Sequence, residues 1–393
     1  MTGVEVLVAV TAILVILGVV ELSLHARRLA TIRIRIHVNG TRGKSSVTRL
    51  IAAALREAGI RTCAKTTGST ARMILPDGHE LPIYRPGGPN IIEQKRIVAV
   101  AAAYNAEALV IECMALSPLL QSLCELKLVR ATHAVITNVR PDHLEVMGPK
   151  EPDVGRALIG ITPVRGKLYT SEHTHLDLLR MAAADRKSEL IVVDALDDHE
   201  VLEKFRYTEH ADNVALALAV CADLGIERDV ALRGMWKARP DPGAMTERRL
   251  DFFGRRIVFV NGFAANDPVS SEQVWSLTLE RHNGVQRTIA VFNCRNDRPD
   301  RSRALGEACA AWRPADHVVL MGSSTHLFAD AATRAGIDAT KLVFVEGLPV
   351  EEVFERIVSL TGESALVMGM GNIGGDGLKL AAYFANRAAP ERD

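Results

Sequence analysis

Neither sign of charge predominates in this chain of 393 residues, because 47 lysines and arginines balance 47 aspartates and glutamates. The balance excludes a general electrostatic attraction for nucleic acid, and we expect no nucleic-acid partner. The six cysteines include no Cys-x-x-Cys pair and no Cys/His zinc spacing, which indicates reduced, mostly buried cytosolic thiols. Internal repeats and low-complexity tracts are also absent. The remaining composition, 48% apolar, is that of a globular chain with room for two or three domains.

The apolar segment 4–24 contains no charge between a glutamate near each of its ends. A helix of about 20 such residues can cross a membrane, and the following His25, Arg27 and Arg28 favour a cytoplasmic side for the rest of the chain. The lack of a preceding basic region disfavours a cleaved signal peptide, and a buried core helix is a third interpretation. We therefore expect residues 1–30 to form an anchor with a single span in the cell membrane, and the remaining domains to be cytoplasmic.

A glycine-containing segment follows, Gly40-Thr-Arg-Gly-Lys-Ser-Ser, with the features of a loop between a strand and a helix. Gly40 and Gly43 lack the side chains that would keep backbone amides away from a polyphosphate, and the N-terminal end of the next helix attracts the same anion. Lys44 can reach the β- and γ-phosphates, and Ser45 can offer its hydroxyl to Mg²⁺. These residue types in this order predict ATP binding.

The match to the longer pattern G-x-x-x-x-G-K-[ST] is incomplete, because Val38 stands at the position of its first glycine. Taken alone, the shorter string could equally be a helix cap with a solvated lysine. Its context favours the phosphate loop. Isoleucine and valine alternate over residues 32–38, as in a strand, and apolar residues recur at helical spacing over 47–55 before Gly59.

Strand-like and helix-like segments alternate further along the chain, which is typical of a parallel sheet covered by helices. The expected elements are helices over 91–105 and 119–129, strands over 108–113 and 134–138, a turn or hairpin at 76–79 and a surface connector at 84–90. The connector could face a substrate, although an ordinary connection is the simpler interpretation.

Two prolines and a glycine at residues 239–243 mark the best domain boundary. A second α/β block follows, with strands expected over 256–261, 288–293, 317–321 and 365–368. The predicted fold class is therefore α/β. It consists of the anchor helix 1–30, a central parallel-sheet ATP-binding domain 31–239, and a smaller Rossmann-like α/β domain 240–393 that closes over ATP.

Polar side chains follow two neighbouring strands of the central domain. Glu112 ends one strand, and Asn138, Asp142 and His143 follow the next. Open α/β sheets bind ligands at the carboxyl ends of their strands. A lone glutamate or histidine is usually a satisfied or solvated side chain. Beside a phosphate loop, Glu112 and His143 become candidate Mg²⁺ ligands, because hard cations take oxygen ligands and sometimes an imidazole nitrogen.

These motifs together resemble the Mur ligase superfamily of ATP-dependent amide-forming enzymes, over about residues 32–393. The resemblance implies ATP and Mg²⁺ as cofactors. It implies Lys44, Glu112 and His143 as catalytic residues, with Ser45, Glu112 and His143 as metal ligands. The nucleotide-binding residues that it implies or favours are Gly40, Thr41, Arg42, Gly43, Lys44, Ser45, Ser46, Asn138, His210, Asn213, Asn266, Asp267, Asn293, Arg295 and Arg298.

Roles within this set differ. His210 and Asn213 are expected at the nucleotide base, and Asn266 and Asp267 in a loop that closes over ATP. The forks of Arg295 and Arg298, with the amide of Asn293, suit a phosphate or a substrate carboxylate. An ion-paired or solvated loop is the alternative for both arginines.

Within the superfamily the chain is most similar to the membrane-associated poly-γ-glutamate synthase subunit of capsule-type systems, notably over residues 91–94, 291–298 and 369–375. The likeness implies that ATP phosphorylates a glutamate γ-carboxylate and that the amine of an incoming glutamate displaces phosphate. The implied partners are glutamate, the growing poly-γ-glutamate chain, a small multispan membrane subunit and further copies of this chain. One departure concerns the carbamylated lysine that the superfamily places after the metal-binding histidine. Position 158 is Leu158, and neither Lys150 nor Lys167 matches.

Other interpretations remain open. Folylpolyglutamate-type and cyanophycin-type ligases are the nearest alternatives, although neither needs a membrane anchor. A membrane-anchored P-loop kinase or transport ATPase would leave residues 138–143 and the second block unexplained, and an ATP-binding scaffold would release no ADP. Residues 369–374 fit the dinucleotide pattern G-x-G-x-x-G, but no strand–helix–strand unit is expected beyond them, so a turn or anion loop is the better interpretation.

Overall fold

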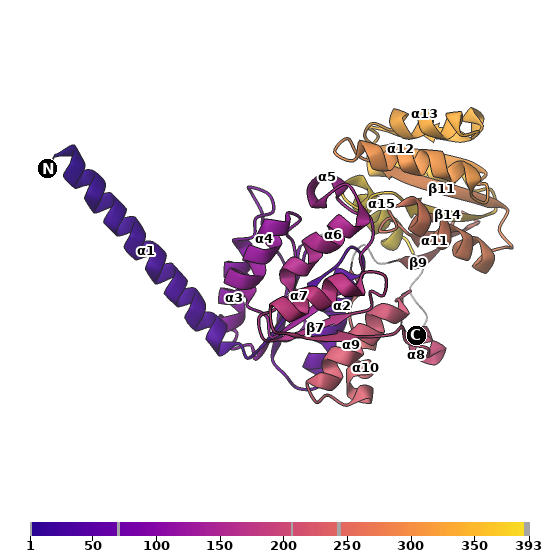
Figure 1. Ribbon diagram of the computed structural model, residues 1–393. Coiled ribbons are helices and arrows are strands. Elements are labelled where there is room, and N and C mark those ends of the chain that lie inside the picture. Colours follow the sequence, from indigo (N-terminus) through magenta and orange to yellow (C-terminus); the bar gives the residue numbers. More distant parts are fainter. Residues whose placement is uncertain (1, 69–70, 206, 242–244, 389–393) are drawn as a thin grey trace. The chain divides into compact units, whose positions relative to one another are not determined.

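The computed structural model describes residues 2–68, 71–205, 207–241 and 245–388 (Figure 1). The chain divides into two compact units, Met1–Asp241 and Pro242–Asp393. Each unit contains one sheet that packs helices against both of its faces.

Eight strands form the first sheet, in the order β4-β3-β2-β5-β1-β6-β7-β8. They are β1 (Ile34–Asn39), β2 (Thr62–Thr66), β3 (Arg72–Ile74), β4 (Glu80–Pro82), β5 (Ala108–Glu112), β6 (His133–Ile136), β7 (Lys167–Thr170) and β8 (Glu189–Val192). All pairs are parallel except β2 with β3 and β3 with β4. Val38 of β1 pairs with Glu112, and Asn39 with Ile136, so the carboxyl ends of three central strands meet at one edge. This edge positions the site.

Helices cover this sheet on both faces, and its central strands are therefore almost entirely buried, as parallel strands usually are. The α-helices are α1 (Gly3–Thr31), α2 (Lys44–Glu57), α3 (Glu93–Ala103), α4 (Pro118–Leu123), α5 (Leu144–Met147), α6 (Glu151–Leu158), α7 (Leu176–Asp185), α8 (His199–Glu203), α9 (Ala211–Asp223) and α10 (Arg228–Trp236). Two shorter helical turns, η1 (Cys124–Val129) and η2 (Ile159–Ile161), follow α4 and α6. Helix α2 is buried nearly all round because α9 and α10 pack on the side that faces away from the sheet.

The second unit has a six-stranded sheet in the order β13-β12-β11-β14-β10-β9, in which only β9 runs antiparallel to its neighbour. Its strands are β9 (Thr246–Phe252), β10 (Arg255–Asn261), β11 (Arg287–Cys294), β12 (His317–Gly322), β13 (Leu342–Phe344) and β14 (Ser364–Met370). Its helices are α11 (Pro268–Arg281), α12 (Pro299–Ala308), α13 (His326–Arg334), α14 (Val350–Leu360) and α15 (Asp376–Ala385), with the turns η3 (Cys309–Ala311) and η4 (Ala339–Lys341). The four strands expected here from sequence are confirmed, and β9 and β13 are additional.

The predicted hairpin at residues 76–79 is confirmed as the β3–β4 turn, and 84–90 is a largely exposed connector. The helical segment predicted over 119–129 is confirmed, but it is not one regular α-helix, because α4 ends at Leu123 and continues directly as the π-helix η1. In this wider turn the Arg130 amide bonds to the Glu125 carbonyl at 2.8 Å. The Glu125 carboxylate accepts a hydrogen bond from the Ala131 amide and contacts His37 of β1 at 2.8 Å. The π-turn thus points a carboxylate at His37, a buried histidine of the strand that leads into the phosphate loop.

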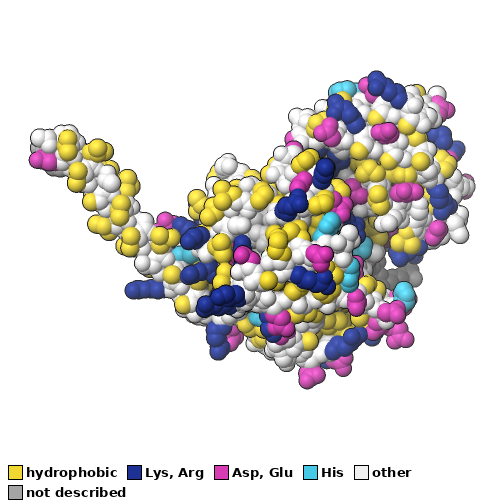
Figure 2. Space-filling model, in the orientation of Figure 1, with side chains coloured by type: hydrophobic (Ala, Val, Ile, Leu, Met, Phe, Trp, Pro, Cys, Tyr) yellow, Lys and Arg dark blue, Asp and Glu magenta, His cyan; other side chains and the backbone are white. Residues whose placement is uncertain are grey.

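Helix α1 is apolar and is exposed over most of residues 3–24, as Figure 2 shows. It is the one helix, among the described residues, that is long and apolar enough to cross a membrane, with a mean hydropathy of 2.7 in its most apolar window. Its last turns are different. His25 and Leu29 are buried, and His25 Nε2 lies 2.9 Å from the carbonyl oxygen of Leu128. The apolar part therefore projects from a base that is fixed to the first unit.

Candidate active site

The phosphate loop occupies residues 40–43, between the end of β1 and the start of α2. Gly40 and Gly43 have backbone φ angles of +131° and +82°, which residues other than glycine rarely adopt. A Cβ atom on Gly40 would lie 1.9 Å from Oγ1 of Thr137. Both glycines are therefore required by backbone geometry. Val38, at the position of a glycine in the longer motif, is a fully buried strand residue, so the loop here is simply shorter.

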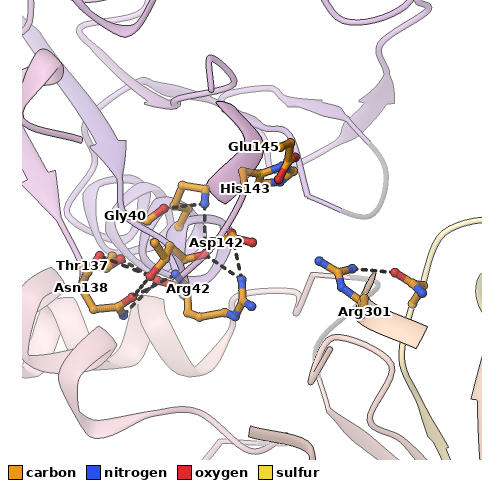
Figure 3. A network of polar contacts seen from close by, with 11 residues as sticks. Gly40, Arg42, Thr137, Asn138, Asp142, His143, Glu145 and Arg301 are labelled. Carbon is orange, nitrogen blue, oxygen red and sulfur yellow. Dashed lines mark hydrogen bonds and ion pairs between the residues drawn. The ribbon is translucent and has the colours of Figure 1, made fainter. Parts of the chain in front are cut away.

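The segment after β6 holds this loop in shape (Figure 3). The Asn138 side-chain oxygen accepts hydrogen bonds from Thr41 Oγ1 at 2.6 Å and from the Arg42 amide at 3.0 Å. Its Nδ2 donates to the Arg42 carbonyl at 3.2 Å, and Thr137 Oγ1 donates to the same carbonyl at 2.5 Å. The Arg42 guanidinium pairs with Asp142 at 3.1 Å. Two segments far apart in sequence thus form one cradle, and Thr137 is a member that the sequence did not single out.

Lys44 extends over the same loop. Its Nζ donates to the carbonyl oxygens of Gly40 at 2.6 Å and Thr41 at 3.3 Å. A lysine ammonium at the mouth of a loop with glycine-exposed amides, followed by a helix N-terminus, forms a polyphosphate site. The residues present therefore fit the triphosphate of ATP.

Glu112 lies at the carboxyl end of β5 and is 2% exposed. One carboxylate oxygen accepts from Ser45 Oγ at 2.8 Å and from the Thr67 amide at 2.6 Å, and the other accepts from Thr67 Oγ1 at 2.7 Å. The structure thus brings together Ser45 and Glu112, two of the predicted metal ligands, while Thr67 was missed because nothing in its local sequence marks it. A serine oxygen beside a carboxylate at a phosphate loop is an oxygen donor set that suits a hard divalent cation.

His143 is the N-cap residue of the short helix α5 and has a φ of +47°, and its Nδ1 lies 3.1 Å from a carboxylate oxygen of Glu145. Within the described ranges, no group of three or more His, Cys, Asp or Glu side chains is arranged to hold a metal ion.

The carbamate position carries no usable group. Leu158 is fully buried in α6, and the nearby Lys167 is ion-paired with Asp223. Burial opposes ionisation of Asp223, but hydrogen bonds from Lys167 and Tyr169 lower its pKa, and the same ion pair raises the pKa of Lys167.

Helix α9 also lies against the phosphate loop. Oδ1 of Asn213 would lie 2.4 Å from a Cβ on Gly43, and Nδ2 donates to Glu209 at 2.8 Å. Burial raises the pKa of Glu209, against the hydrogen bonds that it accepts from Asn213 and the His210 amide. His210 is exposed at the N-cap of α9. The two residues predicted for the base thus stand at one helix end beside the loop, and Glu209 positions Asn213.

The candidate residues of the second unit gather at the carboxyl ends of its strands. Asp267 caps α11 by accepting a hydrogen bond from the Ser270 amide at 2.9 Å. Asn293 is buried and donates to the carbonyl oxygens of Asn372 at 2.6 Å and Gly374 at 3.0 Å. These bonds fix the glycine-rich turn between β14 and α15.

Two arginines stand near the same turn. Arg301 donates to the Asn372 side chain at 2.6 Å (Figure 3). Arg295 forms a two-pronged pair with Asp297, at 2.9 and 2.7 Å, and thereby lowers the pKa of that carboxyl. Asn266 begins no regular element, and Arg298 is the N-cap of α12. The ion-paired alternative considered for Arg295 is therefore present in this structure.

Comparison with known proteins bears on both units. The family description "Mur ligase middle domain" matches residues 38–158, and "Poly-gamma-glutamate synthase CapB C-terminal domain" matches residues 248–387. A folylpolyglutamate synthase of Mycobacterium tuberculosis complexed with ADP superposes with a TM-score of 0.69 at 15% identity, covering 96% of this chain and 95% of that one. MurF of Acinetobacter baumannii gives a TM-score of 0.65 at 17% identity, covering 91% and 78%. Fold and site together define an ATP-dependent ligase of the Mur ligase type.

Relatives in sequence narrow the class. The capsule biosynthesis protein CapB of Bacillus anthracis is 40% identical over 93% of this chain and 79% of its own length. The PGA synthase CapB of Bacillus subtilis is 36% identical over 94% of each chain. The chain belongs to the CapB family of poly-γ-glutamate synthases.

Proposed function

We propose that this protein polymerises glutamate into poly-γ-glutamate, using ATP and releasing ADP and phosphate. The observation that carries the chemistry is the cradle of Gly40, Gly43 and Lys44 beside the Ser45–Glu112 pair. The observation that carries the substrate is the likeness to two CapB proteins along nearly the whole chain.

In this proposal the γ-carboxylate of one glutamate attacks the γ-phosphate of ATP, which forms an acyl phosphate and ADP. The amine of a second glutamate then attacks the acyl carbon, an amide bond forms and phosphate leaves. Lys44 and the loop amides neutralise charge on the transferring phosphoryl group, and Ser45, Glu112 and His143 would hold Mg²⁺. Bound Mg²⁺ would supply further stabilisation of the phosphate charge.

The remaining site residues have roles that follow from their places. Asn213, held by Glu209, and His210 would contact the nucleotide base from the start of α9. The second unit would contribute Asn266 and Asp267 when it closes over ATP, and closure would exclude water from the acyl phosphate. Arg295, Arg298 and Asn293 would meet a phosphate or substrate carboxylate; Arg295 would have to exchange its Asp297 partner for that anion.

Helix α1 would anchor the enzyme in the cell membrane by a single span, with both catalytic units in the cytoplasm, where ATP is available. We further propose a small multispan membrane subunit and further copies of this chain as partners. Alkaline carbonate extraction of membranes tests the anchor. The protein should stay in the pellet, and its recovery in the supernatant would contradict the span.

ADP release by the reconstituted full-length protein tests the activity. Release should depend on both Mg²⁺-ATP and glutamate, and it should accompany growth of a γ-linked polymer. Other amino acids and a folate acceptor serve as comparison substrates. Lys44→Ala should abolish release, while Lys127→Ala, an exposed lysine in η1, should leave it unchanged. Release that is indifferent to glutamate, or that is greater with the folate, would contradict the proposed substrate.

A further inference from the structure

A cavity of about 420 Å³ opens where α1 joins the first unit. Arg27 and Arg28 of α1 line it, together with Arg33 just before β1 and Arg61 just before β2; Glu107 is the acidic residue of its lining. Figure 2 shows lysine and arginine side chains gathered at this junction, at the base of the apolar helix. The volume falls within the range of about 300–1,000 Å³ that is usual for small-ligand sites.

Positive charge is in excess in this cavity. Glu107 lies 3.7 Å from Arg33 and 3.9 Å from Arg61, so one carboxylate serves two guanidinium groups. No carboxylate of the described residues lies within ion-pair distance of Arg27 or Arg28, and both side chains are exposed. Four guanidinium groups around one carboxylate leave a site whose charge complements an anion, and arginine forks match phosphate oxygens in particular.

The cavity also lies at a defined depth relative to the apolar span. At about 1.5 Å per residue, residues 4–20 extend about 26 Å, close to the thickness of the hydrocarbon core, so Glu21 and its partner Lys95 lie at the cytoplasmic edge of that core. Arg27 and Arg28 follow Glu21 by about 10 Å along the helix axis, a depth from which an arginine side chain reaches the polar headgroup layer. A membrane spanned by α1 therefore brings phosphate groups to the level of these arginines.

The base of α1 is held firmly enough to keep this register. His25 bonds to the Leu128 carbonyl, Leu29 is buried, and Glu21 pairs with Lys95 of α3 at 2.9 Å. These contacts join the base of α1 to the segments that line the cavity, so a membrane spanned by α1 has the cavity at its headgroup layer.

We propose that this cavity binds the headgroup of one anionic phospholipid, whose phosphate takes the place between Arg28 and Arg61. The inference rests on the proposed membrane span of α1. Bound lipid would fix the orientation of the ATP-binding unit on the cytoplasmic surface. The polyanionic product is the other anion near this surface, but its attraction would not require a cavity at the depth of the headgroups.

Native mass spectrometry of the full-length protein in detergent tests the proposal, with phosphatidylglycerol and phosphatidylcholine as probes. The wild type should retain one phosphatidylglycerol in preference to phosphatidylcholine. The variant Arg28→Gln/Arg61→Gln should bind phosphatidylglycerol roughly 30-fold more weakly, at about fivefold for each arginine near a membrane surface. The charge-matched control Arg156→Gln/Arg228→Gln removes two exposed arginines elsewhere in the first unit and should bind like the wild type.

Several outcomes would overturn the proposal. Equal affinity of the wild type for the two lipids would contradict an anionic headgroup site. Equal affinity of the wild type and the Arg28/Arg61 variant for phosphatidylglycerol would show that this cavity does not bind the lipid. Displacement of the lipid by an equal concentration of glycerol phosphate would show a general anion site, and displacement by a glutamate oligomer would assign the cavity to the polymer. Carbonate extraction of the same protein separates these results from a failure of the anchor, since a protein without a span leaves the membrane whatever its lipid affinity.

Discussion

Asn138 offers the sharpest test of how the phosphate loop is built. Its side chain accepts two hydrogen bonds from the loop and donates a third, and all three join it to Thr41 or Arg42. The structure therefore makes Asn138 a residue that positions the loop. Asn138→Ala should leave the sheet intact while the loop loses its support, and nucleotide affinity should fall.

The expected size follows from the three bonds. A hydrogen bond within a folded protein contributes about 1 kcal/mol net, so the variant loses about 3 kcal/mol of the free energy that stabilises the ordered conformation of the loop. If that order must be restored when nucleotide binds, the affinity for ADP or ATP falls by about 100-fold, at 1.36 kcal/mol for each factor of ten. Isothermal titration calorimetry with ADP and Mg²⁺ measures the change directly.

Asn90→Ala provides the control, because the Asn90 side chain accepts one exposed hydrogen bond, from the Ile92 amide, within the connector that precedes α3. It should bind ADP like the wild type. Thermal unfolding of both variants shows whether the fold persists. A folded Asn138→Ala protein that binds ADP within twofold of the wild type would refute the argument that these bonds order the loop.

Three further predictions concern the same unit. Glu112→Gln should reduce ADP release by about 100-fold or more without unfolding the protein, because a charge at the phosphate site is lost; near-normal turnover would exclude Glu112 from catalysis. Gly40→Ala should abolish binding of a fluorescent ADP analogue, since its Cβ would overlap Thr137 at a φ of +131°, and retained binding would show that the loop can rearrange. Burial opposes ionisation of Glu93, but hydrogen bonds from Arg85 and the positive charge and hydrogen bond of Lys65 together lower its pKa below the ordinary 4.5. This carboxylate therefore contributes stability above pH 4.5 that is lost as the pH falls through the folded pKa. The free energy of unfolding in urea should fall less on acidification for Glu93→Gln than for the wild type. An identical pH dependence would contradict a contribution of the Glu93 ion pair to stability.

The sequence predicted much of the architecture because local patterns carry it. A buried face makes apolar residues recur at the period of the strand or helix that carries it. This recurrence can be counted in the sequence over the strand at 32–38, the helix at 47–55 and the strands of the second unit. The helical segment over 119–129 is confirmed as well, but its spacing does not reveal that its second half, η1, is a π-helix. There the Glu125 carboxylate contacts His37, 88 positions away, and accepts a hydrogen bond from the Ala131 amide.

The candidate site divides in the same way. The sequence by itself determined the phosphate loop, since two glycines, a lysine and a serine specify a backbone conformation and a charge within a few residues. Only the tertiary structure decided that Thr67 donates twice to Glu112 and that Thr137 and Asn138 hold the loop. Those contacts join residues separated by 45 to 97 positions, and parallel strand order alone brings such segments to one edge. The arginine cavity was equally beyond the sequence, because a pocket arises where a helix, two strand ends and a neighbouring helix meet in space.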